Sequence, residues 1–127
     1  MRRQYHSRLV SGRKLIWDVH RLIELSKDLP VEAVPLTQIV ELDEPYWFED
    51  SKPICREIAL HARLIAETDL THPIILSSDG RVMDGMHRVC KALTEDRTVI
   101  AAVRFRETPA PDYVDADLEA LPYDEPW

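Results

Sequence analysis

The chain has 127 residues, of which 45% are hydrophobic and 31% are charged, a composition typical of one soluble globular domain. No apolar run approaches the roughly 18 residues that a membrane span needs, and the Arg-rich start lacks the apolar stretch of a signal peptide, so we expect a cytoplasmic protein without a membrane partner. The two cysteines, Cys55 and Cys90, lie far apart without CxxC spacing, which argues against a disulfide framework and a zinc ribbon.

The net charge of -7 is distributed unevenly along the chain. Residues 107–127 contain seven acidic residues and neither Lys nor Arg, whereas the first fourteen residues contain five basic residues and no acid. We interpret residues 1–30 as a basic arm followed by an amphipathic helix, and residues 107–127 as an acidic, proline-rich tail with at most one short helix. Solvated ends without a specific role are the simplest interpretation. A basic arm on nucleic acid and an acidic tail folded back on a basic face are the alternatives.

The first predicted elements are a helix, a strand and an aromatic loop. Residues 14–27 place apolar side chains at helical spacing and predict an amphipathic helix that ends before Pro30. Residues 31–42 are rich in β-branched side chains and predict a strand that runs into a turn, with Pro35 tolerated at a strand edge. Residues 43–53 predict a loop whose adjacent aromatic side chains should cover another part of the molecule: Tyr46, Trp47 and Phe48.

The second half alternates helices with short strands. The patterns predict helices over 55–68 and 86–96, and strands over 72–78, 82–85 and 98–105. The expected inward-facing side chains of the two helices are Ile58, Ala59, Ala62 and Ile65, and Val89, Cys90 and Leu93. Because strands and helices interleave, the expected fold is α+β (mixed α/β), in which residues 31–106 pack helices on a small mixed sheet.

The turn "DGMHR", Asp84-Gly85-Met86-His87-Arg88, joins a strand to a helix. A glycine at this place lets the backbone turn tightly and leaves the first N–H groups of the helix uncovered, which is a geometry that binds phosphate. His87 and Arg88 would add a switchable hydrogen-bond donor and a permanent cation. The alternative is that Asp84 caps the helix and that His87 and Arg88 are ordinary surface residues.

Three stretches follow one another in a characteristic order: the strand "VPLTQIVEL", the helix "REIALHARLIAET" and the run "HPIILSSDGRVMDGMHRVCKAL". In this order they resemble the ParB/sulfiredoxin-like superfamily, and the resemblance covers about residues 31–106. It implies that the turn and the helix start bind nucleotide phosphates, which assigns this role to Gly85, Met86, His87 and Arg88.

The branches of that superfamily differ in what they do with the nucleotide. Sulfiredoxins require a reactive cysteine where this chain has Met86, and a thioether cannot form a thiolate, so sulfiredoxin chemistry is not expected. The chromosome-partitioning branch binds CTP at a GERR-type turn and carries a DNA-binding domain downstream, whereas this chain has GMHR and an acidic tail. The free-serine kinases use a similar turn with an acidic base near the end of the first strand, where this chain has Glu41, Asp43 and Glu44.

Two functional hypotheses follow. In the first, the domain binds a nucleoside di- or triphosphate such as ATP, ADP or CTP, with or without Mg²⁺, and uses it for phosphoryl transfer or hydrolysis. Its site residues would be Asp84, Gly85, Met86, His87 and Arg88 on the phosphates, Trp47 on the base, His87 polarising a phosphate oxygen, and Glu41 or Glu44 as base or Mg²⁺ ligand. No resident metal site is predicted. In the second, the chain is a non-enzymatic adaptor that binds DNA or protein.

Overall fold

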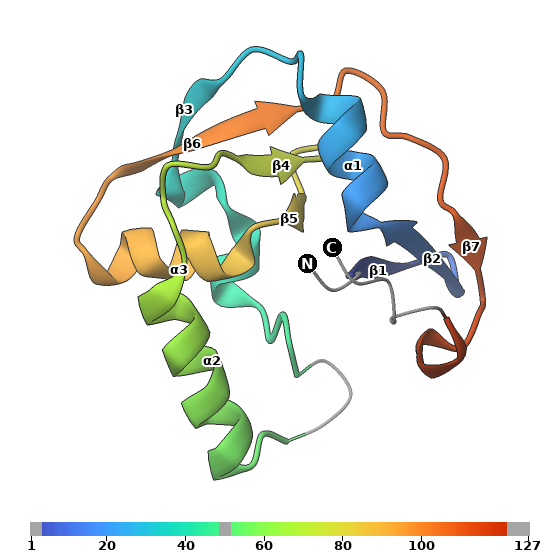
Figure 1. Ribbon diagram of the computed structural model, residues 1–127, viewed down its shortest axis with the longest axis horizontal. Helices are drawn as coiled ribbons and strands as arrows, with labels where there is room; N and C mark the ends of the chain where they lie inside the picture. Colours follow the sequence, from blue (N-terminus) through green and yellow to red (C-terminus); the bar gives the residue numbers. More distant parts are fainter. Residues whose placement is uncertain (1–3, 49–51, 122–127) are drawn as a thin grey trace.

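The computed structural model describes residues 4–48 and 52–121. The regular elements in chain order are β1 (Tyr5–Val10), β2 (Arg13–Asp18), α1 (Val19–Ser26), β3 (Glu32–Pro35), α2 (Cys55–Glu67), β4 (Ile74–Leu76), β5 (Val82–Asp84), α3 (Met86–Thr94), β6 (Val99–Arg104) and β7 (Tyr113–Val114) (Figure 1). Short 3₁₀ turns are η1 (Leu36–Gln38), η2 (Val40–Asp43) and η3 (Leu118–Ala120). The expected small mixed α+β fold is confirmed.

The strands form two sheets. The central sheet has four strands in the order β3-β6-β4-β5, in which β4 and β6 are parallel and the other pairs are antiparallel. The second sheet is antiparallel and has the order β1-β2-β7. Helix α3 and the hairpin β1-β2 with α1 lie at different ends of the molecule, and α2 projects away from the sheets below α3 (Figure 1).

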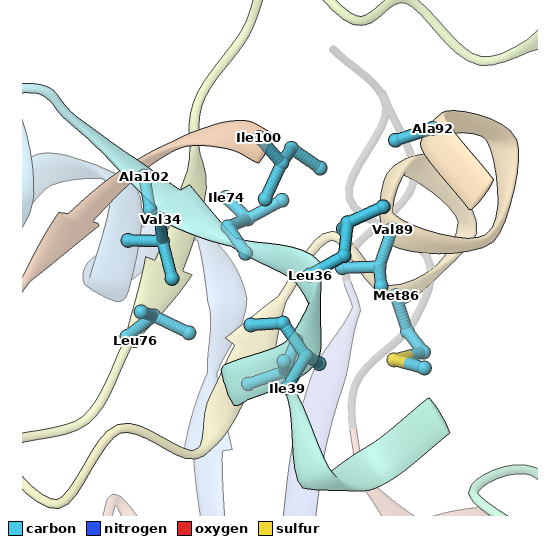
Figure 2. Close-up of a cluster of buried hydrophobic side chains, with 11 residues drawn as sticks. Val34, Leu36, Ile39, Ile74, Leu76, Met86, Val89, Ala92, Ile100 and Ala102 are labelled. Carbon is cyan, nitrogen blue, oxygen red and sulfur yellow. The ribbon is translucent and has the colours of Figure 1, made fainter. Parts of the chain in front are cut away.

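Both faces of the central sheet are buried. Successive side chains of a strand point to opposite faces, so Ile74 and Leu76 pack in the cluster with α3 whereas Ile75 packs in the cluster with Trp17 and Leu22. Figure 2 shows the first cluster, in which the strands and the loop after β3 meet α3: Val34, Leu36, Ile39, Ile74, Leu76, Met86, Val89, Ala92, Ile100 and Ala102. This double burial explains why "PIIL" is a continuous apolar run.

The prediction of one helix over residues 14–27 is wrong in its first part, because residues 13–18 form β2 and the helix begins at Val19. Ser11 and Gly12 have φ angles of 53° and 78° and connect β1 to β2, as a tight hairpin requires. Asp18 then starts α1, since its side chain accepts a hydrogen bond from the His20 backbone N–H at 3.0 Å. The predicted basic arm is therefore a paired strand over the part of it that is described.

The acidic tail folds back on the hairpin, which was one of the two alternatives to solvated ends. Asp115 accepts hydrogen bonds from the Lys14 backbone N–H and from Arg13, and Asp112 accepts one from the Asp18 backbone N–H at 2.8 Å. Between the sheets, the Trp17 indole N–H donates to the Pro109 carbonyl at 2.8 Å. Residues 107–121 are thus a structural strap rather than a free tail, and residues 122–127 lie outside the described part.

The inward-facing residues of the two helices were predicted only in part. Helix α2 contains no buried residue, and Ile58 is 53% exposed, because the helix contacts the body mainly through α3. On α3 the buried residues are Met86, Val89 and Ala92, whereas Leu93 is 51% exposed and Cys90 is half-buried.

None of the helices within residues 4–48 and 52–121 combines the length and the apolar character that a membrane span requires.

The strap generates a test. A chain that ends after Arg106 loses β7, the acceptor of the Trp17 indole N–H and both aspartates that bind the hairpin. Each lost hydrogen bond contributes about 0.5–1.5 kcal/mol net, and Trp17 loses part of its cover, so we expect a clearly lower midpoint of thermal unfolding. A chain that ends after Leu121 is the matched reference, because it differs from the shorter chain only by residues 107–121, and it should have the higher midpoint. Equal midpoints for both truncated chains would contradict the structural role of the strap.

Candidate functional site

The turn between β5 and α3 depends on a glycine. Gly85 has a φ of 106°, and a Cβ atom there would lie 2.6 Å from Ile74 Cγ2 and 2.9 Å from an Arg88 guanidinium nitrogen. Ile74 is fully buried, so it has no room to move away. Gly85 is also the N-cap of α3 and supplies no capping side chain. The first N–H groups of an α-helix have no acceptor inside the helix. At the start of α3 they can therefore donate to a bound anion.

Arg88 clamps this turn in place. Its Nη1 donates to the carbonyls of His72 at 2.9 Å and Pro73 at 3.0 Å, and its Nη2 donates to Asp84 Oδ2 at 2.9 Å. The side chain is only 13% exposed. The guanidinium thus ties the start of β4 to the end of β5 and is neutralised by Asp84. The predicted role of Asp84 as a side-chain cap is not seen, because its carboxylate pairs with Arg88.

His87 belongs to a stacked group of three rings that we call the Trp47 cluster: Trp47, His61 and His87. His61 Nδ1 lies 2.9 Å from His87 Nε2. The Trp47 ring centroid lies 4.3 Å from that of His61 and 4.4 Å from that of His87, with interplanar angles of 23° and 17°. Because the two imidazoles are hydrogen-bonded to each other, both lie on the same face of the indole. The aromatic loop therefore covers the start of α3, as the sequence predicted that it should cover something.

Burial lowers the pKa of both imidazoles of the Trp47 cluster. Burial lowers the pKa of His87, and the neighbouring His61 lowers it further. Burial also lowers the pKa of His61, an effect that the Glu57 carboxylate partly offsets. We therefore expect two neutral rings near pH 7, joined by a hydrogen bond that one of them donates.

A cavity of about 780 Å³ opens beside the turn. Small-molecule sites fall in the range of about 300–1,000 Å³ and are mostly apolar with a few convergent polar groups. The cavity lining includes Asp84, Gly85, His87 and Arg88 at the turn, other polar residues such as Gln4, and a set of apolar side chains. The apolar side chains come from α1, the segment after it, the end of α2 and the central sheet: Val19, Ile23, Leu29, Val31, Leu64, Ile75 and Val103.

The two predicted carboxylates lie elsewhere, and neither lines this cavity. Glu41 is 2% exposed, accepts a hydrogen bond from the Val82 backbone N–H at 2.6 Å and lies 3.4 Å from Arg81 Nε. Glu44 accepts two hydrogen bonds from Arg81, at 3.1 and 2.7 Å. Both carboxylates are occupied in holding the loop before Tyr46 against β5. Their predicted roles as catalytic base or Mg²⁺ ligand stay predictions, and the described residues contain no group of three or more potential metal ligands.

The remaining predicted residues divide between core and site. Met86 is 5% exposed and packs in the core with Leu36 and Ile39, so only its backbone is available to a ligand. Trp47 packs on the imidazoles of His61 and His87 and is not among the residues that line the cavity. Its predicted stacking on a base stays a prediction. His61 was not singled out by sequence reasoning, because its partner His87 lies 26 residues later and no local motif joins them.

In comparisons with family models, curated proteins and solved structures, nothing matched this chain. The assignment of a function therefore depends on the chemistry of the site.

The glycine at the turn can be tested by adding one methyl group. Gly85→Ala should destabilise the fold by about 3 kcal/mol, because it combines a positive φ with a collision in the core. Gly12→Ala is the matched control, since Gly12 has a φ of 78° and nothing within 4 Å, and it should cost about 1 kcal/mol. Urea denaturation of both variants measures the difference. Equal losses would show that Ile74 and Arg88 do not restrict position 85.

Proposed function

We propose that this domain binds a nucleotide or a related phosphate ester in the cavity beside α3. The observation that carries the proposal is the position of the cavity, which reaches the glycine turn and the first residues of α3. A phosphate placed there would accept hydrogen bonds from the free N–H groups of Met86, His87 and Arg88 and would face the positive end of the helix dipole. The resemblance of residues 31–106 to the ParB/sulfiredoxin-like superfamily supports the same site and the same ligand class.

Hydrogen bonding contributes more to this proposed site than net charge does. Arg88 is paired with Asp84, and Glu67 and Asp69 line the same cavity as Lys27 and His72. The cavity therefore offers no strong excess of positive charge near the turn. Binding would rely on oriented N–H groups and on His87, which favours one well-placed phosphoryl group over several phosphates held by cations.

The apolar wall supplies the contact for the rest of the ligand. Val19 and Ile23 on α1 and Leu29 after it line the same cavity as the turn. A nucleoside, or another flat or branched apolar group, would cover these side chains and gain free energy from their burial. These side chains offer no hydrogen bonds to the edge of a base, so discrimination between bases would depend on polar lining residues such as Gln4 and Ser26.

Binding rather than catalysis is the function that the geometry favours. Glu41 and Glu44 are engaged by Arg81 and the β5 backbone, so they are not poised to activate a nucleophile. Phosphoryl transfer and hydrolysis remain predictions that this site does not support further. In this proposal the chain is a domain that responds to nucleotides. Its expected location is the cytoplasm, because nucleotides are abundant there.

A specific observation also favours the second hypothesis, an adaptor for another protein. Helix α2 exposes three large apolar side chains, Ile58, Leu60 and Leu64, and its N-cap residue Ile54 is exposed as well. Apolar side chains gathered on one projecting helix are typical of a protein interface. The two hypotheses separate by their response to ligand, because an adaptor that acts through α2 alone would be indifferent to nucleotides.

Two variants on one helix test the nucleotide proposal. Ile23 lines the cavity and is 40% exposed, whereas Leu25 is 50% exposed on the same helix and does not line it. A carboxylate at position 23 should repel the phosphates, so Ile23→Asp should weaken ATP binding about tenfold or more while Leu25→Asp leaves it unchanged. Isothermal titration of the full chain with ATP, ADP and CTP measures the affinities. No binding by the unmodified chain, or equal affinities of both variants, would refute the proposed site.

A further inference from the structure

The Trp47 cluster contains two titratable side chains whose protons are coupled by contact. His61 on α2 and His87 on α3 share one hydrogen bond of 2.9 Å, and His87 also lines the cavity. No described residue is hydrogen-bonded to His87 Nδ1 or to His61 Nε2 in the structure. The ring nitrogen that His87 can offer to a ligand is therefore Nδ1, because Nε2 is already engaged.

The direction of the shared hydrogen bond decides what His87 Nδ1 can do. The neutral pair carries two protons on four ring nitrogens. When His61 Nδ1 donates, His87 carries its proton on Nδ1 and can donate to an anionic oxygen. When His87 Nε2 donates instead, Nδ1 presents a lone pair that repels an anion. His61 thus controls whether His87 favours or opposes an oxyanion in the cavity.

We propose that His61 is a positioning residue for His87 and that the pair takes up one proton from solvent when an oxyanion binds in the cavity. The singly charged pair carries three protons, one on His87 Nδ1, one shared between the rings and one on His61 Nε2. In that state Nδ1 is always a donor, so the bound anion and the added proton stabilise each other. The proposal rests on the proposed function, since it requires the oxyanion of a phosphate ester or a simpler analogue at this site.

The surroundings of the pair favour one positive charge but not two. The indole of Trp47 stacks on both imidazoles, and an aromatic face stabilises a cation placed on it. On α2 the carboxylate of Glu57 favours protonation of His61, whereas a second charge on the pair would meet the first across a 2.9 Å contact.

The other groups around the pair are engaged in contacts of their own. On α3, Arg88 is neutralised by Asp84, Lys91 donates to the Ala66 and Thr68 carbonyls at the end of α2, and the Cys90 thiol has a raised pKa and is uncharged. On the loop, Tyr46 is occupied by contacts with His6 and the Val82 carbonyl. Burial opposes protonation of both imidazoles in the free protein, so the anion supplies the charge that makes proton uptake favourable.

The sign of the pH dependence follows from this linkage. If the bound state holds one more proton than the free state, affinity rises as pH falls, by up to about tenfold per pH unit above the pKa of the free pair. Sulfate is the appropriate probe, because its own charge stays constant between about pH 5 and 8, where histidine titrates. Titration of the full chain with sulfate in buffers of different ionisation enthalpy should give close to one proton taken up per sulfate bound.

Two substitutions separate positioning from structural support. His61→Gln keeps an amide N–H that can donate to His87 Nε2, so it should retain sulfate affinity at pH 8 within about threefold. His61→Phe keeps a ring on Trp47 but no donor, and should lose about tenfold in affinity with a thermal midpoint no lower than that of His61→Gln. Equal sulfate affinities of the two variants, or an affinity of the unmodified chain that does not change with pH, would overturn the proposal.

A measurement without ligand distinguishes failure of this proposal from failure of the proposed function. Nuclear magnetic resonance titration of the imidazole nitrogens in the free full chain should show two protonation steps separated by more than about one pH unit, because the rings interact. Two independent steps near the ordinary histidine pKa would overturn the pairing, whatever binds. If the steps are coupled but neither sulfate nor ATP binds, the proposed function fails and the coupling to an anion fails with it.

Discussion

A side chain at position 85 would collide with Ile74 and with the guanidinium of Arg88, and this steric constraint determines the geometry of the site. Only a glycine lets the backbone pass this close to β4. Arg88 then holds the turn in place by hydrogen bonds to two backbone carbonyls and to the Asp84 carboxylate. With the turn fixed, the first residues of α3 have defined positions. Gly85, His87 and Arg88 line the cavity, and His87 reaches His61 on the neighbouring helix.

The part of the cavity lining that comes from α1 depends on segments near both ends of the chain. Helix α1 contributes Val19 and Ile23 to this lining, and it begins where Asp18 caps it at the end of β2. The strap of residues 107–121 supports the same strand by pairing β7 with β2 and by accepting the Trp17 indole N–H. Segments at both ends of the described chain therefore hold one side of a cavity whose other side is the turn in the middle of the sequence.

The sequence predicts the central sheet and the turn because their signals are local. The run "PIIL", the glycine after β5 and the apolar spacing of α3 each lie within a few residues. The sequence does not predict the β1-β2 hairpin, because the apolar side chains of residues 14–18 fit the spacing of a helix as well as the alternation of a strand. The only local sign of the turn is the pair Ser11-Gly12. The roles of Glu41 and His61 could not be predicted, since their partners lie 41 and 26 residues away and only the fold brings them together.

The central claim is that a phosphate binds at the start of α3, and amide chemical-shift mapping tests it most directly. ATP added to uniformly ¹⁵N-labelled full chain should move the backbone N–H signals of Met86, His87 and Arg88 in a saturable way, together with those of residues near Ile23 on α1. His87, Arg88 and Ile23 line one cavity and Met86 is next to them in the chain, so the shifts should share one binding curve. Saturable shifts confined to β1-β2 or to the exposed face of α2, or no shifts at all, would contradict the account.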